Sequence, residues 1–252
     1  MSFVNIRDIR VRANSMNTLA IDTSTKNFSL AVSRNGKIVR YRNIFLDKVL
    51  ESSIIPAIEK ILRDSKLKFK DLDGYAVGLG PGSFTSLRVG LSTIKAFALV
   101  TGKPVVGISS LDVIAMNVLD EPADQICTIM DARRKQIYAC LFENKGGVLK
   151  RKGDYSLTNI DDLLDSVHGR TLFVGDGIAL WREVIEEKYA KAAKNGAQCQ
   201  AVFADDKHAH PQAKNLSHLA YGRFEKKVYD DVETLVPIYL YTQDCQVEPR
   251  KK

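Results

Sequence analysis

The sequence lacks the features of several common protein classes. It has no run of about 18 consecutive apolar residues, so we expect no membrane-spanning helix. Its first residues do not show the charged-then-apolar pattern of a secretory signal peptide. No pair among its 4 cysteines has the Cys-x-x-Cys spacing of a zinc or redox site. We therefore expect reduced thiols and a cytoplasmic protein that does not contact membranes.

The sequence is also poor in residues that hold metals or nucleotides. It has only 4 histidines, of which His208 and His210 are close together, and these precede Pro211 in a predicted loop. A solvent-exposed loop is a better interpretation of this pair than a metal site. The glycine-rich segment around residue 82 lacks the Gly-Lys-Ser/Thr ending of a Walker loop. We expect no metal and no cofactor bound by this chain alone.

The composition is that of an ordinary globular protein. The chain has 252 residues, of which 45% are hydrophobic and 27% charged, enough for one large domain or two small ones. A net charge of +7 permits an RNA or acidic partner without requiring one. Residues 1–15 show no clear period and are predicted as a flexible arm, or as a leader skipped by a start at Met16. Residues 243–252 are predicted as a solvated tail.

The first half alternates between strand and helix patterns. A three-stranded antiparallel meander is predicted, because Asn35-Gly36 is the strongest short hairpin signal. A helix over residues 48–65 follows, in which Pro56 should kink the helix or reset its start. The predicted elements, in order, are strands 18–23, 28–33 and 37–44, helix 48–65, strand 74–80, a helix from Ser83 to 100, and strand 105–108.

The second half repeats this alternation more loosely. The predicted elements are helix 112–119, strands 125–131 and 136–143, helix 160–167, strand 171–174, helix 178–194, strand 200–204 and helix 214–227. This order is expected of a ribonuclease-H-like unit used twice, with domains at 16–108 and 109–242. Alternation alone would equally allow a doubly wound sheet.

Three segments are candidates for ligand binding. Asp22-Thr23-Ser24-Thr25 stands at a predicted turn, where hydroxyls and backbone N–H groups could bond phosphate and Asp22 could hold metal-bound water. The alternative is a turn stabilised by its own Asp and Ser side chains.

The second segment runs from Gly80 to Gly90, with the sequence GPGSFTSLRVG. Glycine lets the backbone approach a ligand, and the following helix N-terminus presents free N–H groups. The candidate ligand-binding residues are Gly80, Gly82, Ser83, Thr85 and Arg88. The alternative is a glycine-rich turn with a serine cap.

The third segment, Met130-Asp131-Ala132-Arg133-Arg134, lies between two predicted strands. Asp131 and Arg133 could form a buried pair that shapes a groove, although three charges at a strand end are more often a solvated turn.

These segments together carry a resemblance to a known family. LAIDTST, GLGPGSFTSLRVGLSTIKAFA, PVVGISSLDVIA, MDARRKQIY and FVGDG occur in this order and resemble the TsaB (YeaZ) family of bacterial threonylcarbamoyladenosine biosynthesis subunits. The resemblance covers essentially residues 16–241. It implies an α/β protein with two ribonuclease-H-like domains of the actin-like, sugar kinase and Hsp70 superfamily.

The resemblance also implies a function. The protein would be a non-catalytic partner of the related subunit TsaD, acting with the ATPase TsaE, in threonylcarbamoylation of the adenosine beside the anticodon of certain tRNAs. The stretch 109–114, SSLDVI, has no imidazole where the catalytic relative carries a His-x-x-x-His metal pair. Asp176, within Gly175-Asp176-Gly177, adds negative charge where relatives have a glycine-rich adenosine loop. Any ATP or ADP is therefore expected at the interface with the catalytic partner.

A partner surface is predicted on the first domain. The family pairs through two helices of that domain, either as a homodimer or with TsaD, while tRNA is contacted indirectly or weakly. The predicted interface residues are Leu50, Ile54, Ile58, Ile61, Leu87, Leu91 and Lys95. The alternative is that the second domain covers these helices. A self-sufficient actin-like ATPase or kinase is the second functional hypothesis, followed by a glycoprotease and a stand-alone RNA binder.

Overall fold

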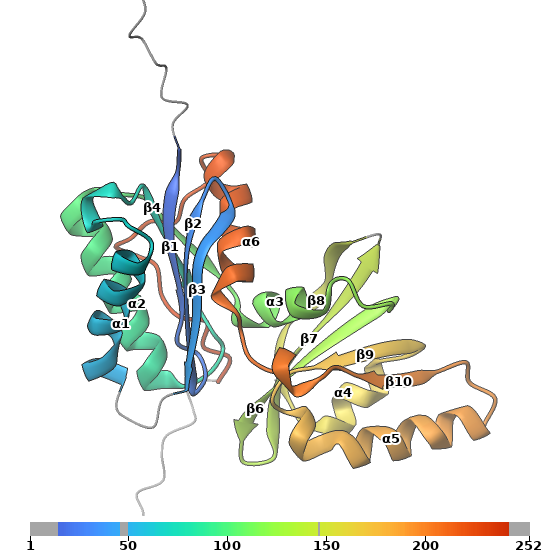
Figure 1. Cartoon of the computed structure of the whole chain (residues 1–252). Coiled ribbons are helices and arrows are strands. Elements are labelled where there is room, and N and C mark those ends of the chain that lie inside the picture. Colours follow the sequence, from blue (N-terminus) through green and yellow to red (C-terminus); the bar gives the residue numbers. More distant parts are fainter. Residues whose placement is uncertain (1–14, 46–49, 146, 242–252) are drawn as a thin grey trace, which may run out of the picture.

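The computed structural model describes residues 15–45, 50–145 and 147–241, and these form two five-stranded sheets (Figure 1). All but one residue of the predicted arm, and the whole of the predicted tail, lie outside the described residues.

The first sheet has the strand order β3-β2-β1-β4-β5. The first three strands are antiparallel, and β4 and β5 run parallel to β1. The predicted hairpin is confirmed, since Asn35 and Gly36 both have positive φ, at 49° and 72°. The strand bounds are β1 Asn17–Asp22, β2 Asn27–Arg34, β3 Lys37–Phe45, β4 Gly74–Gly78 and β5 Val105–Ile108.

The second sheet repeats the topology of the first, strand for strand. Its order is β10-β9-β6-β7-β8, with β6, β7 and β8 antiparallel and β9 and β10 parallel to β6. The bounds are β6 Gln125–Arg133, β7 Gln136–Lys145, β8 Val148–Thr158, β9 Arg170–Val174 and β10 Gln200–Phe203. This repeat confirms the two ribonuclease-H-like units and excludes the single doubly wound sheet.

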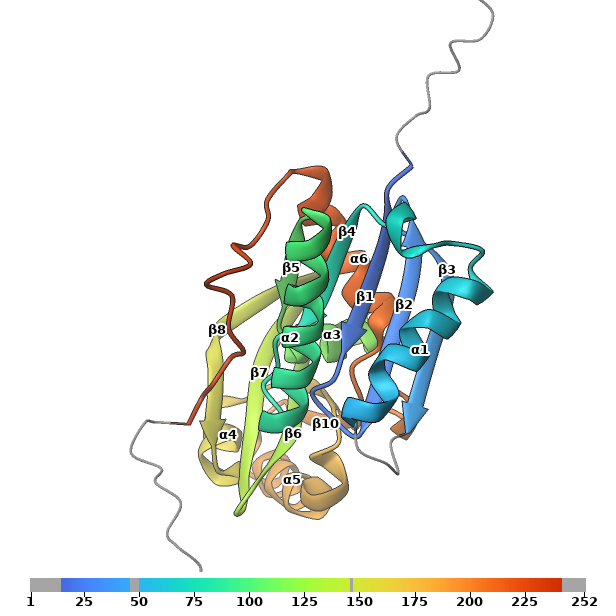
Figure 2. The ribbon, with the colours of Figure 1, turned by 90° about the vertical axis from the view of Figure 1, so that its left-hand side faces the viewer.

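Two helices cover one face of the first sheet, and a third covers the other. α1 (Leu50–Asp64) and α2 (Phe84–Thr101) lie side by side over the strands (Figure 2). α6 (Ala213–Glu225) packs on the opposite face through alanines and larger apolar side chains. Pro56 lies inside α1, so it does not reset the start of that helix as predicted.

The second sheet is covered in the same manner. α4 (Ile160–Ser166) and α5 (Ile178–Lys194) pack on its outer face, and α3 (Ser110–Ala115) packs on its inner face. α3 and α6 contact each other, so the two helices separate the two sheets (Figure 1). Short 3-10 turns occur at Phe69–Asp71, Met116–Val118 and Asp206–His208.

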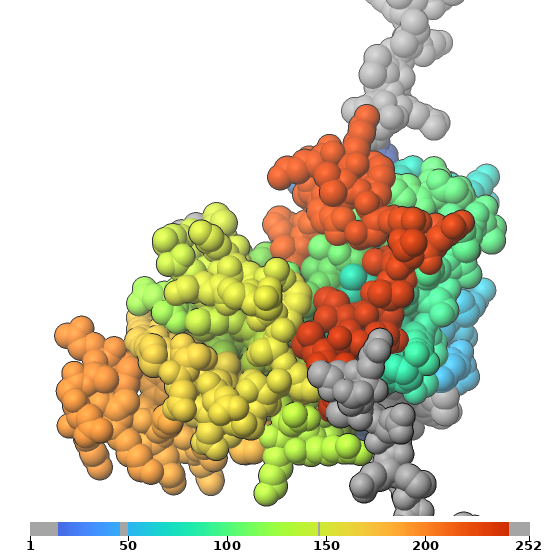
Figure 3. All heavy atoms as spheres, turned by 180° about the vertical axis from the view of Figure 1, so that it is seen from behind, coloured from blue at the N-terminus to red at the C-terminus, as the bar shows by residue number. Residues whose placement is uncertain are grey.

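The last described segment, residues 226–241, is a strap that returns across the first half of the molecule (Figure 3). Arg223 and Asp230 anchor its start to β5, where Gly107 donates a 2.7 Å hydrogen bond to Asp230. Lys95 Nζ then donates to two strap carbonyls, and Ile238 N donates to the Leu79 carbonyl at 2.8 Å. The strap and α6 belong to the range predicted for the second domain, yet they pack on the first.

Candidate functional site

A cleft of about 980 Å³ lies between the two halves of the molecule. Its lining comes from the β1–β2 turn with the start of α2, the β6–β7 hairpin with the turn after β9, and the end of the strap, together with Phe45 at the end of β3 and His210 before α6. Among the predicted ligand-binding residues, the structure brings five together here. They are Ser24, Gly82, Ser83, Asp131 and Arg133.

Asp22 lies behind the cleft wall and is completely buried. Its Oδ1 accepts hydrogen bonds from Ser24 N and Ser24 Oγ, at 2.9 and 2.6 Å. Its Oδ2 accepts from Ser110 Oγ at 2.7 Å. Burial raises the pKa of this carboxyl, while the bonds from Ser24 and Ser110 act in the opposite direction. The prediction that Asp22 holds metal-bound water is therefore corrected, because no face of the carboxylate is open to solvent.

The residues next to Asp22 and in the following loop also form hydrogen bonds within the protein. Thr23 is buried, and its Oγ1 donates to the Ser86 carbonyl at 2.8 Å. Gly80 exchanges bonds with α3: its N–H donates to Ser110 Oγ at 3.2 Å, and its carbonyl accepts from Ser110 N at 2.8 Å. Thr23 thus joins the end of β1 to α2, and Gly80 joins the end of β4 to α3, instead of facing a ligand.

Gly82 permits a close approach of two loops. A Cβ at this position would lie 2.2 Å from the Ser24 carbonyl oxygen, and φ is +156°. Ser83 N donates to the same carbonyl at 2.8 Å. The glycine is thus required by loop packing, and the adjoining N–H is already satisfied within the protein.

The start of α2 is open to solvent. Ser83 is its N-cap residue, but the serine side chain makes no capping bond and instead pairs with Ser86 Oγ at 3.0 Å. Thr85 and Arg88 are exposed on the first turns. The Arg88 guanidinium lies 3.7 Å over the Phe84 ring, and its Nε donates to Tyr239 Oη at 3.1 Å.

On the opposite wall, a small polar network joins β6 to the turn after β9. Asp131 N donates to Asp176 Oδ1 at 3.0 Å, and Arg133 pairs with Asp131 at 3.3 Å. Burial raises the pKa of Asp176, with an opposing contribution from His210. The Asp131–Arg133 pair is not buried, because the Arg133 side chain is 78% exposed.

Sequence reasoning missed the aromatic residues of the cleft. Phe45, Phe84, Tyr239 and Tyr241 come from three separate segments and all line it. Only the IYLY run near the C-terminus could have drawn attention to the last two, since its aromatic residues alternate with apolar ones.

The predicted partner interface needs correction. Leu50, Ile54, Ile58, Ile61, Leu87 and Leu91 are buried in this chain's own core, at 0–5% exposure. They lie on the faces of α1 and α2 that pack into the core of the first half, and only Ile58 also lines the floor of a groove between the two helices. Lys95, the seventh predicted residue, is half-buried and holds the strap.

A groove of about 1070 Å³ runs between the solvent-facing sides of these helices, and its floor reaches the core residues Ile58 and Leu62. Apolar side chains of α1, α2 and the loop after α1 line it, including Ile55, Leu67, Phe97 and Val100. Val100 is 87% exposed. The basic residues Arg63, Lys66 and Lys68 surround this apolar floor, with Glu59 beside them.

Within the described ranges, no three His, Cys, Asp or Glu side chains converge as a metal site would require. In the same ranges, no helix combines the length and apolar character needed to cross a membrane.

Two ribonuclease-H-like units with a cleft between them define a protein of the actin-like and sugar-kinase-like class. A family model described as "TsaD: tRNA N6-adenosine threonylcarbamoyltransferase" matches residues 47–250, and the chain belongs to this family. Within it, the chain is similar to the tRNA threonylcarbamoyladenosine biosynthesis protein TsaB of Bacillus subtilis, with 28% identity over 92% of this chain and 97% of the relative.

Solved structures agree on the fold. YeaZ from Pseudomonas aeruginosa superposes with a TM-score of 0.73 and 22% identity, covering 89% of this chain and 100% of that one. A ROK hexokinase from Thermus thermophilus covers 84% of this chain and 100% of its own, with a TM-score of 0.51 and 12% identity.

Proposed function

We propose that this chain is a non-catalytic subunit required for N6-threonylcarbamoylation of the adenosine beside the anticodon in tRNAs. The observation that carries the proposal is the similarity to a TsaB protein along nearly the whole of both chains. The subunit would act by binding and activating a TsaD-type catalytic partner.

The arrangement around Asp22 supports a non-catalytic role. A phosphate-transfer site needs a carboxylate that can reach a metal ion and its water. Here the carboxylate is sealed by Ser24 and Ser110, and the backbone around Gly82 is packed against the β1–β2 turn. The residues do not fit a magnesium–nucleotide complex held by this chain alone. We therefore assign any ATP or ADP to a site shared with the catalytic partner.

The groove between α1 and α2 supports a protein partner. Contiguous apolar surface of this kind usually marks an interface in proteins that form complexes. Its apolar floor suits an apolar helix face, and its basic border suits acidic residues on that partner. In isolation, two copies of the chain would pair through the same groove. A TsaE-type ATPase would join the complex of this chain with its catalytic partner.

The experiment is an omission test. The modification is reconstituted with TsaD, TsaE, threonylcarbamoyl-adenylate synthase, ATP, threonine, bicarbonate and tRNA, with and without this chain. The tRNA is digested, and the modified nucleoside is quantified by mass spectrometry. We expect product only when the chain is present; equal product without it would refute the proposal.

The cleft between the two units favours one alternative, a self-sufficient actin-like ATPase or kinase, because small-molecule sites occur preferentially between domains. Hydrolysis of ATP by the isolated chain, abolished by a change at Ser24, would favour that alternative. Hydrolysis that is unaffected by this change indicates a contaminating enzyme instead.

A further inference from the structure

The mouth of the cleft combines exposed aromatic rings with positive charges that have no ion-pair partner in the described part of the chain. We use "cleft mouth" for the residues Lys26, Phe45, Phe84, Arg134, Tyr239 and Tyr241, all of which line the cleft. They come from distant parts of the sequence, which is why no RNA-binding motif is visible in the sequence itself. Only the fold brings them to one place.

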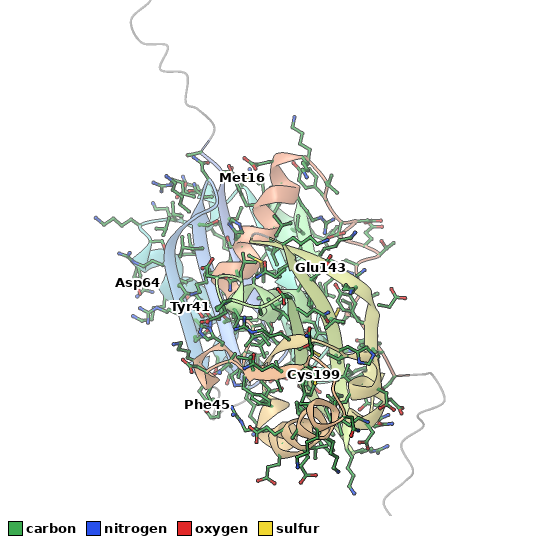
Figure 4. All side chains as sticks on the ribbon, turned by 90° about the vertical axis from the view of Figure 1, so that its right-hand side faces the viewer. Met16, Tyr41, Phe45, Asp64, Glu143 and Cys199 are labelled. Atoms are coloured by element: carbon green, nitrogen blue, oxygen red, sulfur yellow. The ribbon has the colours of Figure 1, made fainter. Side chains whose placement is uncertain are left out.

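The aromatic side chains of the cleft mouth have high solvent exposure for side chains of their size. Phe45, at the end of β3, is 61% exposed and has no ring partner among the described residues (Figure 4). Phe84 and Tyr239 are about half exposed and stay in place because they pack on each other, with ring centroids 5.3 Å apart. Tyr241 is fixed by a hydrogen bond from its hydroxyl to the Ala132 carbonyl. Exposed rings of this kind are platforms on which bases can stack, and three of the four are held in place by the contacts above.

The cations of the cleft mouth are free to bind an anion. Lys26 and Arg134 are exposed and form no ion pair with any described residue. Arg88 stacks on Phe84 of the cleft mouth, and it also lacks a carboxylate partner in the described ranges. Interleaved aromatic and basic side chains are typical of surfaces that bind single-stranded nucleic acid.

The β6–β7 hairpin presents its basic side chains at a conformational cost. Arg133, Arg134 and Lys135 all have positive φ, at 67°, 50° and 61°. Each left-handed residue other than glycine costs of the order of 1 kcal/mol. Glycine or asparagine would relieve this strain, as Asn35-Gly36 does in the β2–β3 hairpin. Three successive basic residues in this conformation indicate that their charge is used.

The cleft also contains carboxylates, which can accept hydrogen bonds from the edges of bases but would repel phosphates. Asp131 and Asp176 lie on the wall formed by the second sheet, and Asp176 receives a hydrogen bond from Asp131 N. Carboxylate oxygens accept hydrogen bonds from the amino groups of cytosine or adenine. An acidic peptide would leave both these acceptors and the exposed rings unused.

We propose that the cleft mouth binds a short single-stranded stretch of RNA, with unpaired bases on its aromatic rings and phosphates on its cations. The inference rests on the proposed function, because the adenosine beside the anticodon lies among unpaired nucleotides. It adds to that function a direct RNA contact by this chain.

The test measures binding of the full chain to three fluorescent probes at 50–200 mM salt by anisotropy. The probes are an anticodon stem-loop, an RNA hairpin of equal length whose loop is a stable tetraloop, and a polyglutamate peptide of equal charge. We expect the anticodon stem-loop to bind at least about tenfold more tightly than the other two. Equal binding of the polyglutamate peptide, or no preference for the open loop, overturns the proposal.

Two variants separate stacking from charge. Phe45→Ala should weaken binding of the anticodon stem-loop about tenfold or more without changing its salt dependence. Lys26→Glu with Arg134→Glu should lower the slope of log affinity against log salt by about 0.7 for each phosphate that the variant no longer neutralises. Both variants should retain the wild-type circular dichroism spectrum, because all three side chains are exposed. Wild-type affinity in both variants contradicts the assignment.

A matched control uses Lys150→Glu on β8. Lys150 is exposed and pairs with Glu143, which the strand register places at the end of β7 away from the Arg133–Gln136 tip. The control should bind the RNA like the wild type after correction for net charge.

If RNA binding is absent while the omission test still requires the chain, this inference fails and the proposed function stands. If the cleft mouth binds the stem-loop but the chain is dispensable for modification, the proposed function fails alone.

Discussion

The hydroxyl of Ser110, at the start of α3, donates a 2.7 Å hydrogen bond to the buried carboxylate of Asp22, at the end of β1. This contact joins the first sheet to the helix that leads into the second unit. Ser24 satisfies the other carboxylate oxygen, so Asp22 organises a junction of three chain segments. The residue most suggestive of metal chemistry in the sequence thus has a structural role here.

The first prediction follows from that junction. Asp22→Asn keeps an oxygen for Ser24 and an amide that can donate to Ser110, so the free energy of unfolding should change by no more than about 1 kcal/mol at pH 7. Asp22→Ala leaves two serine hydroxyls without their acceptor and should cost about 2–4 kcal/mol. Urea unfolding of both variants measures the difference. Equal losses in the two variants would show that the negative charge itself stabilises the junction.

The pH dependence gives a second prediction. Burial raises the pKa of Asp22 in the folded protein, so the folded state holds this proton to higher pH than the unfolded chain. The contribution of Asp22 to stability therefore falls as pH rises from about 4 to the raised pKa, and is constant above it. Asp22→Asn should gain stability relative to wild type over that window and hold the gain at higher pH. A gain that shrinks with rising pH would mean that the pKa is lowered.

A third prediction concerns the strap. Asp230 accepts hydrogen bonds from Arg223 and from Gly107 N, and its side chain is about one quarter exposed. Asp230→Ala should cost about 1–3 kcal/mol, because it leaves a half-buried guanidinium without its partner. It should also speed tryptic cleavage after Lys226 and Lys227, which precede the strap anchor.

The control for the strap is Asp205→Ala, which removes an ion pair to Lys207 between two well-exposed side chains. Exposed pairs contribute little, so this variant should unfold like the wild type. If Asp230→Ala matches the control in both measurements, the anchor does not hold the strap.

Much of the fold was predictable from the sequence, and the failures have physical reasons. Most strands and long helices have strong local periodicity, and the Asn35-Gly36 turn fixes a hairpin by itself. β8 was missed because VLKRKGDYSLT is an edge strand rich in charge, without the alternation of a buried strand. Of the two effects predicted for Pro56, the reset of the helix start does not occur, because α1 packs on the sheet from Leu50 onward.

The site was predictable only in part. Motifs located Ser24, Gly82, Ser83, Asp131 and Arg133 near the cleft, because each lies at a strand end or turn. Periodicity identified the apolar stripes of α1 and α2 but could not tell a core-facing stripe from a partner-facing one. The stripe through Ile54 and Ile58 faces the core, and single residues beside it, such as Ile55, remain at the surface.

A fourth prediction tests the groove between α1 and α2. Val100→Lys adds a charge to an exposed apolar position in the last turn of α2, where a cation is tolerated by the helix dipole. Folding should be unchanged by circular dichroism, while self-association and binding to a TsaD-type partner should weaken at least about tenfold by analytical ultracentrifugation.

The control for the groove is Leu180→Glu, at a 62% exposed position in the first turn of α5 on the second unit. It adds a charge of the sign that suits a helix N-terminus and should leave association intact. Loss of association in Leu180→Glu but not in Val100→Lys would move the interface to the second unit.

The last prediction concerns Gly90, where α2 crosses the β1–β2 turn. A Cβ at this position would lie 2.3 Å from Thr23 Oγ1, which is held by its bond to the Ser86 carbonyl. Gly90→Ala should therefore cost about 1–3 kcal/mol, despite a gain in helix propensity of about 1 kcal/mol. The matched change Gly222→Ala in α6 meets no atom within 4 Å and should stabilise the protein by about 0.5–1 kcal/mol.

A double-mutant cycle measured by urea unfolding tests the contact itself. Thr23→Ala removes the obstructing oxygen, so Gly90→Ala should destabilise the Thr23→Ala variant less than it destabilises the wild type. Additive effects of the two changes would show that Thr23 does not obstruct the new methyl group. In that case α2 moves away from the β1–β2 turn, and the contact of Gly90 with Thr23 does not fix the position of α2.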